Sequence, residues 1–385
     1  MTLHGSCSRE FAAVAAGAAD VLMEPGTGFA VAVFHRGEPV VDLWAGEAEP
    51  GREWRTDTVV QCYSATKAVT ALAAHWCVDQ ELLELDAPIA VVWPEFASVG
   101  KGGVTLRHVL AHRSGLHDVM SLLGDDITRL ARWDDMARAL ERARPAFPPG
   151  SASAYAAVTY GYLVGEVVRR ASGRPLASVI DGEIARPLRL DGCFVPLPDG
   201  ARDRVAVLGP PPPVPSVRPP TDATRSRGPA VRSEFVGSLG NRAVAAMLRD
   251  PEFAGTPMPA THGFFTARSL ARVYAMLAGG GDIDGTRVLT PSVIAAATTV
   301  QSDDPDRVMM LRMFWRLGFH RVFSKARAGR AAFGHNGFGG SGAWAEPARE
   351  LAFAFVTNGL SAEMLLDDRM LALGDAAIRA VDGVG

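Results

Sequence analysis

Ser64 and Lys67, three residues apart in the segment QCYSATKAVT (61–70), are the residues whose types and spacing best suit covalent chemistry. They would share one face of a helix that begins at the serine. A serine hydroxyl is a weak nucleophile until a base removes its proton. Lysine becomes such a base when burial lowers its pKa, and this lysine, one of only three in the chain, lies in an apolar segment. The pattern therefore suits a nucleophile and its base.

The start of a helix would also help the serine to react. Free N–H groups there favour negative charge, and the serine's own N–H can supply half of an oxyanion hole. A serine that caps a helix, followed by a lysine that reaches solvent, gives the same short pattern. Taken alone, the segment favours this second, structural interpretation, so the rest of the chain must decide.

The elements that would position this pair follow a simple order. Strands are expected near both ends of the chain, because apolar, β-branched runs there flank glycine-rich turns. Helices are expected between them, and the helix from Ser64 is apolar nearly all round, which indicates a buried central helix. The expected strands are 28–34, 40–46, 313–322, 331–347 and 351–358, and the expected helices are an N-terminal surface helix, the helix from 64, then 104–116, 127–143, 155–173, 266–281 and 370–383.

This order predicts an α/β (α+β) fold: an antiparallel sheet built from both termini and flanked by helices, plus an all-helical lobe. We expect residues 1–62 and 258–385 to form the lobe that contains the sheet. Residues 63–257 would form the helical lobe, including a proline-rich loop at 209–229 that is either a lid, a tether or a surface crossing without function. The active site would lie where the two lobes meet.

Composition narrows the function classes. The 385 residues carry a formal net charge of -3, which gives no basic excess for nucleic acid. No apolar run is long enough to span a membrane, and the N-terminus lacks the basic start of a signal peptide, so a cytoplasmic protein is expected. Cys7, Cys62, Cys77 and Cys193 have no paired spacing and are expected to be free thiols. We expect no metal and no cofactor.

Several segments, in order along nearly the whole chain, resemble the serine β-lactamase and penicillin-binding-protein superfamily. The resemblance is strongest to class C β-lactamases and family VIII esterases. YSATKAVTALA is similar to the SxxK helix of the family, and PPGSASAYAAVTYGYLVGEVVRRASGRPL to its tyrosine segment. DLWAG, VTLRHVLAHRSGL, FFTARSLARVYAMLAGGG and FGHNGFGGSGAWAEPARELAFAFVTN resemble other segments of the family, and together they are far more specific than any one motif.

The resemblance implies a role for each matching residue. Ser64 matches the acyl-accepting nucleophile, Lys67 its proton partner, and Tyr155 the tyrosine that passes protons to the leaving group. The family's third motif aligns with His335, Asn336 and Gly337, which would line the substrate site; there Gly337 would let a strand pass close to the substrate. The N–H groups of Ser64 and Phe338 would form the oxyanion hole. Trp344 is also expected to bind substrate, in an apolar, closable pocket formed with Phe338 and the proline-rich loop.

Two positions depart from the class C pattern. Ala157 replaces an asparagine and His335 replaces a lysine, and both changes weaken the case for a β-lactam substrate. The resemblance therefore implies an enzyme that acylates Ser64 and hydrolyses small carboxylic esters. The alternative is a transacylase of natural-product biosynthesis that passes the acyl group to an amine or alcohol. A β-lactamase, a D-amino-acid peptidase or a non-catalytic binding protein is a weaker hypothesis.

Two further patterns were weighed for other chemistry. His108, His112 and His117 have spacings that suit a zinc site, but no acidic ligand accompanies them at a recognised distance. GFGGSGAW resembles a nucleophile elbow, but Ala343 breaks its pattern. Both segments are expected to have packing roles.

Overall fold

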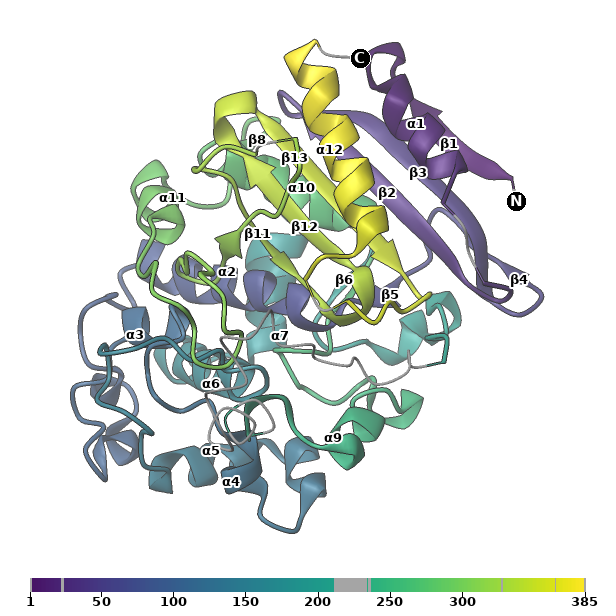
Figure 1. Cartoon of the computed structure of the whole chain (residues 1–385). Coiled ribbons are helices and arrows are strands. Elements are labelled where there is room, and N and C mark those ends of the chain that lie inside the picture. The colour runs from purple at the N-terminus through teal and green to yellow at the C-terminus, as the bar shows by residue number, and fades with distance from the viewer. Residues whose placement is uncertain are drawn as a thin grey trace, which may run out of the picture.

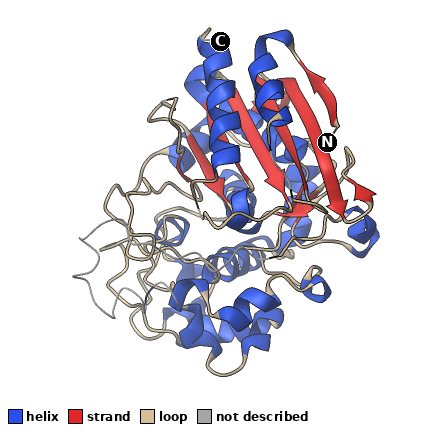
Figure 2. Ribbon diagram, turned by 45° about the vertical axis from the view of Figure 1, so that its right-hand side comes forward, coloured by secondary structure: helices blue, strands red, loops and turns tan. Residues whose placement is uncertain are grey.

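In the computed structural model, which describes residues 2–21, 24–210, 234, 237–326, 328–363 and 365–383, an antiparallel sheet stands beside a mass of helices (Figures 1 and 2). The strands of the sheet run in the order β1-β3-β2-β13-β12-β11-β10, and β4 pairs with β3. This order joins strands from both ends of the chain, as predicted. The strands are β1 (Leu3–Cys7), β2 (Gly28–His35), β3 (Glu38–Glu49), β4 (Arg52–Glu53), β10 (His320–Arg321), β11 (Phe333–Asn336), β12 (Gly342–Glu346) and β13 (Leu351–Thr357).

The expected hairpin at 28–46 is present as β2 and β3. Its two-residue turn consists of Arg36 and Gly37, both with positive φ, which matches the right-handed twist of the paired strands. From Phe29 to His35, β2 also pairs with the whole of β13, so the N-terminal and C-terminal parts of the sheet are joined at its centre. The sheet therefore cannot form until the two ends of the chain have met.

The two faces of the sheet have different covers. Helices α1 (Ala12–Ala19) and α12 (Asp368–Asp382) pack side by side over the outer face, near both termini (Figure 1). Large side chains such as Phe29, Leu43 and Phe353 fill this layer. Small residues such as Ala343 and Ala354 point to the inner face, where helix α10 (Ala267–Ala278) packs against β2, β12 and β13.

The remaining helices form the second half of the molecule, around α2 (Thr66–Asp79). This helix is buried over most of its length, as its apolar sequence predicted, and it packs against α6 (Thr159–Ser172). The other helices are α3 (Leu106–Leu110), α4 (Val119–Leu123), α5 (Trp133–Arg142), α7 (Leu176–Val179), α9 (Arg242–Met247) and α11 (Pro291–Thr298). Two small sheets consist of β5 (Val60–Gln61), β7 (Phe264–Phe265) and β6 (Cys193–Phe194), and of β8 (Asp282–Ile283) and β9 (Thr286–Arg287).

Short helical turns connect these elements. Their bounds are η1 (Arg9–Phe11), η2 (Tyr63–Ala65), η3 (Ile89–Val91), η4 (Pro94–Ala97), η5 (Ile127–Ala131), η6 (Ile180–Ala185), η7 (Asp199–Arg204), η9 (Pro251–Phe253), η10 (Phe338–Gly340) and η11 (Pro347–Arg349). Among the described helices, none is long and apolar enough to cross a membrane. The lobe boundaries at 62 and 257 stay a prediction.

Several local predictions were wrong. The N-terminal segment starts with edge strand β1 before its helix. Segment 313–322 contributes only the two residues of β10, because most of its backbone forms loops and isolated bridges. The expected helix at 127–143 is broken into η5 and α5. Apart from Gly209 and Pro210, the proline-rich loop lies outside the described residues.

Candidate active site

Ser64 lies in the short turn η2, immediately before α2 begins at Thr66. The helix therefore starts two residues later than the sequence predicted. Tyr63, the residue before the serine, has a φ of 43°, which is unusual for a bulky side chain. This sharp turn leaves Ser64 half-buried while the residues on either side of it are buried.

Lys67 is fully buried and contacts three oxygen atoms. Its Nζ lies 3.0 Å from Ser64 Oγ, 2.7 Å from the carbonyl oxygen of Ala157 and 3.1 Å from that of Ala260. No carboxylate is among these contacts. Burial holds the pKa of Lys67 well below its usual value of 10.5, because water no longer solvates the charged form.

These three contacts suit a neutral amine. A neutral lysine has two N–H bonds and one lone pair. The two carbonyl oxygens accept the two N–H bonds, which leaves the lone pair for the hydroxyl proton of Ser64. After Lys67 takes that proton, the same three oxygens accept its three N–H bonds. The site therefore holds both protonation states without moving.

Tyr155 lies in the loop before α6, not on the helix itself. Its phenol O–H donates to Ser64 Oγ at 2.6 Å. Burial raises the pKa of Tyr155, so the phenol keeps its proton. The ammonium position of Lys67 is 5.0 Å from the centre of the Tyr155 ring, so a cation formed there would be attracted to the ring face. The structure thus joins Ser64, Lys67 and Tyr155 in one hydrogen-bonded group.

His335, on β11, is buried against this group. Its ring centre lies 6.4 Å from that of Tyr155 and 4.8 Å from that of His320. Nδ1–H donates to the carbonyl oxygen of Asn336 at 3.0 Å, and Nε2 is buried without a partner among the described residues. Burial, and then the nearby His320 and Lys67, hold the pKa of His335 well below 6.5. A neutral imidazole therefore stands at the position where class C β-lactamases have a lysine.

His320 was missed in the sequence, and it fixes the end of β11. Its Nε2 accepts the backbone N–H of Asn336 at 3.0 Å, while Nδ1–H donates to the carbonyl oxygen of Arg321 at 2.7 Å. The Asn336 side chain donates through Nδ2 to the carbonyl oxygen of Leu365 at 2.9 Å. Asn336 therefore holds the wall of the site, and any contact of its own with substrate stays a prediction.

Gly337 lets the end of β11 approach the nucleophile. A Cβ atom at this position would lie 2.1 Å from the carbonyl oxygen of Cys62, two residues before Ser64. The next residue, Phe338, packs its ring edge-on against Tyr63, with 5.6 Å between ring centres. The two segments predicted to supply the oxyanion hole are therefore packed together, and the roles of the Ser64 and Phe338 N–H groups stay a prediction.

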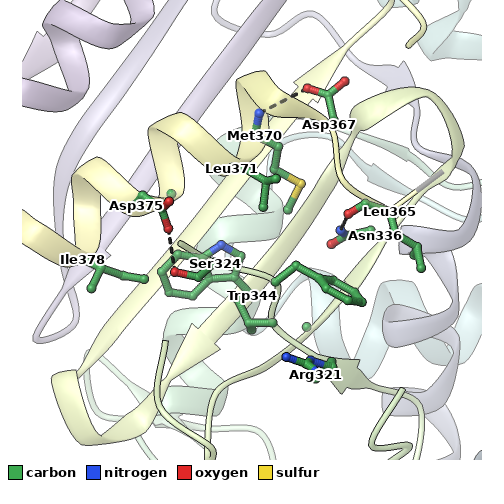
Figure 3. Close-up of a pocket in the computed structure, with 14 residues that line it drawn as sticks. Arg321, Ser324, Asn336, Trp344, Leu365, Asp367, Met370, Leu371, Asp375 and Ile378 are labelled. Carbon is green, nitrogen blue, oxygen red and sulfur yellow. Dashed lines mark hydrogen bonds between the residues drawn. The ribbon is translucent and has the colours of Figure 1, made fainter. Parts of the chain in front are cut away.

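Trp344 does not lie in this site, so its predicted role in substrate binding is wrong. Side chains alternate along β12, and Trp344 points to the outer face while Ala343 and Ala345 point inward. Figure 3 shows its indole among side chains of α12 and of the segment around Ser324. It stacks on Phe353 with 5.4 Å between ring centres.

A pocket opens directly over Ser64. Besides Ser64, Tyr155, the third-motif residues His335 and Asn336, and the neighbouring Phe338, its walls are mostly apolar. Methionines are flexible and can adapt to ligands of different shapes. The remaining lining residues are Leu239, Met309, Met313, Trp315, His320 and Leu365, with no lysine or arginine among them.

The chain matches the model of the Beta-lactamase family over residues 18–376. It belongs to the beta-lactamase family. It is 32% identical over 374 residues to "Esterase/beta-lactamase LipL" of Mycobacterium tuberculosis, which covers 95% of this chain and 85% of that protein. The chain is therefore a serine hydrolase or acyltransferase of the SxxK type.

Two solved structures of similar proteins superpose over nearly the full length. One is a penicillin-binding-protein homologue from Caulobacter crescentus, with a TM-score of 0.88 and 34% identity over 99% of this chain and 100% of that chain. The other is a family VIII carboxylesterase, with a TM-score of 0.88 and 29% identity over the same shares. These likenesses confirm the fold class.

The other patterns weighed in the sequence have structural roles in this beta-lactamase-family protein. His108 Nδ1 accepts the N–H of Thr105 as part of a helix cap, and His112 Nδ1 accepts the N–H of Ala156. His117 stacks on Phe147. Within the described ranges, no group of three or more His, Cys, Asp or Glu side chains could hold a metal ion.

The cysteines and Ser341 also have structural places. All four cysteines are free, and Cys62, Cys77 and Cys193 are buried, as predicted. Ser341 is buried and exchanges hydrogen bonds with the backbone of Thr357. It is therefore part of the sheet, not a second nucleophile.

Proposed function

We propose that this protein hydrolyses small, uncharged carboxylic esters through an acyl-Ser64 intermediate. The observation that carries the proposal is the contact set of Lys67: two backbone carbonyl oxygens and Ser64 Oγ, so that a neutral amine donating to both carbonyls would turn its lone pair toward Ser64. A buried neutral amine beside a serine hydroxyl is an activated nucleophile. Relatives that are named esterases support the same reaction class.

Acylation follows from the geometry. Ser64 Oγ attacks the ester carbonyl carbon while its proton passes to Lys67 Nζ. The carbonyl oxygen becomes an oxyanion, which the N–H groups of Ser64 and Phe338 would hold. When the C–O bond to the alcohol breaks, Tyr155 donates its phenol proton to the leaving oxygen and recovers a proton from Lys67. One alcohol leaves, and the acyl group stays on Ser64.

Release of the acyl group reverses these proton transfers. A water molecule gives one proton to the Tyr155 and Lys67 pair as its oxygen attacks the acyl carbonyl. Ser64 Oγ regains a proton as it leaves. An alcohol or amine in the place of water would give a transacylase by the same steps, and this is the second candidate function.

The neutral His335 favours an uncharged substrate. A β-lactam carries a carboxylate that needs a positive partner, and the described lining of the pocket has none. The apolar walls instead suit a short hydrocarbon chain. The pocket therefore supports ester hydrolysis over β-lactam hydrolysis.

Mass spectrometry of the intact protein with a short-chain activated ester tests the proposal. We expect an adduct on Ser64 that water clears, no adduct and no turnover in Ser64→Ala, and full turnover in the matched control Ser292→Ala, an exposed serine at the start of α11. An adduct that persists until an amine or alcohol is added would establish the transacylase instead. Full turnover by Ser64→Ala would refute both functions.

A further inference from the structure

Asp306 is a buried carboxylate that the sequence motifs do not include. Its side chain is 1% exposed. One oxygen, Oδ1, accepts the backbone N–H groups of Tyr155 at 3.2 Å, Val308 at 2.9 Å and Met309 at 2.8 Å. The other, Oδ2, accepts the indole N–H of Trp315 at 2.9 Å.

The two oxygens of Asp306 therefore hold the two members of one aromatic pair. The rings of Tyr155 and Trp315 are stacked, with 5.5 Å between centres and an interplanar angle of 6°. Oδ1 fixes the pair through the backbone of Tyr155, and Oδ2 fixes it through the indole of Trp315. The loop of Asp306 is also tied to the Tyr155 loop by the N–H of Arg307, which donates to the carbonyl oxygen of Ser153 at 2.9 Å.

We propose that Asp306 is a positioning residue that holds Tyr155 and Trp315 in the arrangement in which the phenol reaches Ser64. This inference rests on the proposed acyl-Ser64 chemistry. The phenol donates to Ser64 Oγ over 2.6 Å, a distance that a small tilt of the ring would lengthen. Misplacement of a reacting group by about 1 Å can cost roughly a hundredfold in rate.

The chemistry of the site explains why a carboxylate is required. A buried carboxylate is costly unless hydrogen bonds compensate for lost water, and here four N–H donors do so. An amide has the same shape but accepts at only one of its two terminal atoms. In Asp306→Asn, Oδ1 would keep its three backbone donors, and the new NH2 group would face the indole N–H of Trp315. Two donors would then oppose each other in a buried site.

This conflict allows a double-mutant test. Trp315→Phe removes the indole N–H, so it removes the conflict that Asp306→Asn creates. We expect Asp306→Asn to lower the acylation rate 10- to 100-fold with a KM within threefold of the unmodified protein. In the Trp315→Phe background, the same substitution should change the rate by less than threefold. Rates are measured by rapid mixing with a chromogenic ester, per active site titrated with a fluorophosphonate.

A pH profile separates positioning from a merely structural role. Burial, and then the negative charge of Asp306, raise the pKa of Tyr155. Both effects keep the pKa of Tyr155 above the working pH range, and Asp306 is not among the causes that set the pKa of Lys67, so a loss of positioning in Asp306→Asn should lower the rate by the same factor at every pH. The titratable groups that face Tyr155 are Lys67, His112, His335 and Asp306, with Tyr160 behind His112.

The outcomes distinguish this inference from the proposed function. If Asp306→Asn acylates at the full rate, or loses the same factor in both backgrounds, Asp306 does not position the pair. If it only lowers the titratable fraction and leaves the rate per site unchanged, its role is in folding alone. Ser64→Ala tests the acyl-enzyme separately, so its failure would not be mistaken for that of Asp306.

Discussion

Substituting Gly337 by alanine tests whether the close packing of Gly337 against the backbone of Cys62 fixes the position of Ser64. The new Cβ would lie 2.1 Å from the carbonyl oxygen of Cys62, and ordinary contact begins at 3.4 Å. The two atoms must therefore separate by about 1.3 Å, the difference of these distances. Gly337 has a φ of −99°, which alanine adopts without strain, so the effect is steric. The displaced carbonyl belongs to the segment that carries Ser64.

A displacement of this size should strongly reduce the rate. Because a misplacement of about 1 Å can cost roughly a hundredfold in rate, kcat/KM should fall at least about 100-fold, which corresponds to about 2.7 kcal/mol. The assay is ester hydrolysis per folded molecule, with thermal unfolding measured in parallel. Gly103→Ala is the matched control, because a Cβ there meets nothing within 4 Å and should change neither quantity. A Gly337→Ala protein with unchanged kcat/KM would refute the reasoning.

Four further predictions follow from the same site and core. The value of kcat/KM should rise with pH as Lys67 loses its proton. Because burial lowers the pKa of Lys67, this rise should be complete well below pH 10.5, and a rise centred near pH 10.5 would contradict the reasoning. His335→Lys should raise acylation by a chromogenic cephalosporin roughly 10-fold by adding a partner for its carboxylate, and no gain would show that charge is not what excludes such substrates. Trp344→Phe should leave KM unchanged and lower the melting temperature, whereas a raised KM would return Trp344 to the site. Burial lowers the pKa of His75 to about 4, so between pH 6.5 and pH 4 the unfolded chain binds a proton that the native state does not. The free energy of unfolding, measured with urea, should therefore fall by about 3 kcal/mol over this pH range. His75→Gln, which has no such group, should lose less over the same range.

The fold was largely predictable because its signals are local. Alternating or continuous apolar runs mark β2, β3 and β13, and the buried helix α2 is apolar all round. The errors occur where contacts between residues far apart in the sequence determine the secondary structure. Segment 313–322 has a strand-like sequence, but Trp315 donates to Asp306 and stacks on Tyr155. Because these contacts hold the segment away from the sheet, most of it does not form a strand.

The reactive side chains of the site were predictable from the sequence. The backbone atoms that hold these side chains in place were not. Ser64, Lys67 and Tyr155 were named from the family resemblance, because the Ser64 and Lys67 pattern alone favoured a structural interpretation, and the structure joins all three by hydrogen bonds. The acceptors that hold Lys67 are backbone carbonyls of two alanines, and a carbonyl leaves no mark in a sequence. Trp344 was misassigned because an aromatic residue near a motif shows nothing of the face to which it points.

Asp306 is a residue whose contact with Tyr155 is visible only in the structure. An aspartate in the charged segment DDPDR (303–307), nine residues before a tryptophan, is unremarkable in the sequence until the backbone of Tyr155 is seen to donate to it. Tyr155 is thus held at its backbone by the buried Asp306 and at its phenol by the half-buried Ser64. Because both ends of Tyr155 are fixed, a change at Asp306 must either move the phenol or break the stack with Trp315. Measuring Asp306→Asn in the unmodified protein and in Trp315→Phe separates these two cases. The coupling energy between Asp306 and Trp315 then measures how strongly residues outside the family's motifs fix the position of Tyr155.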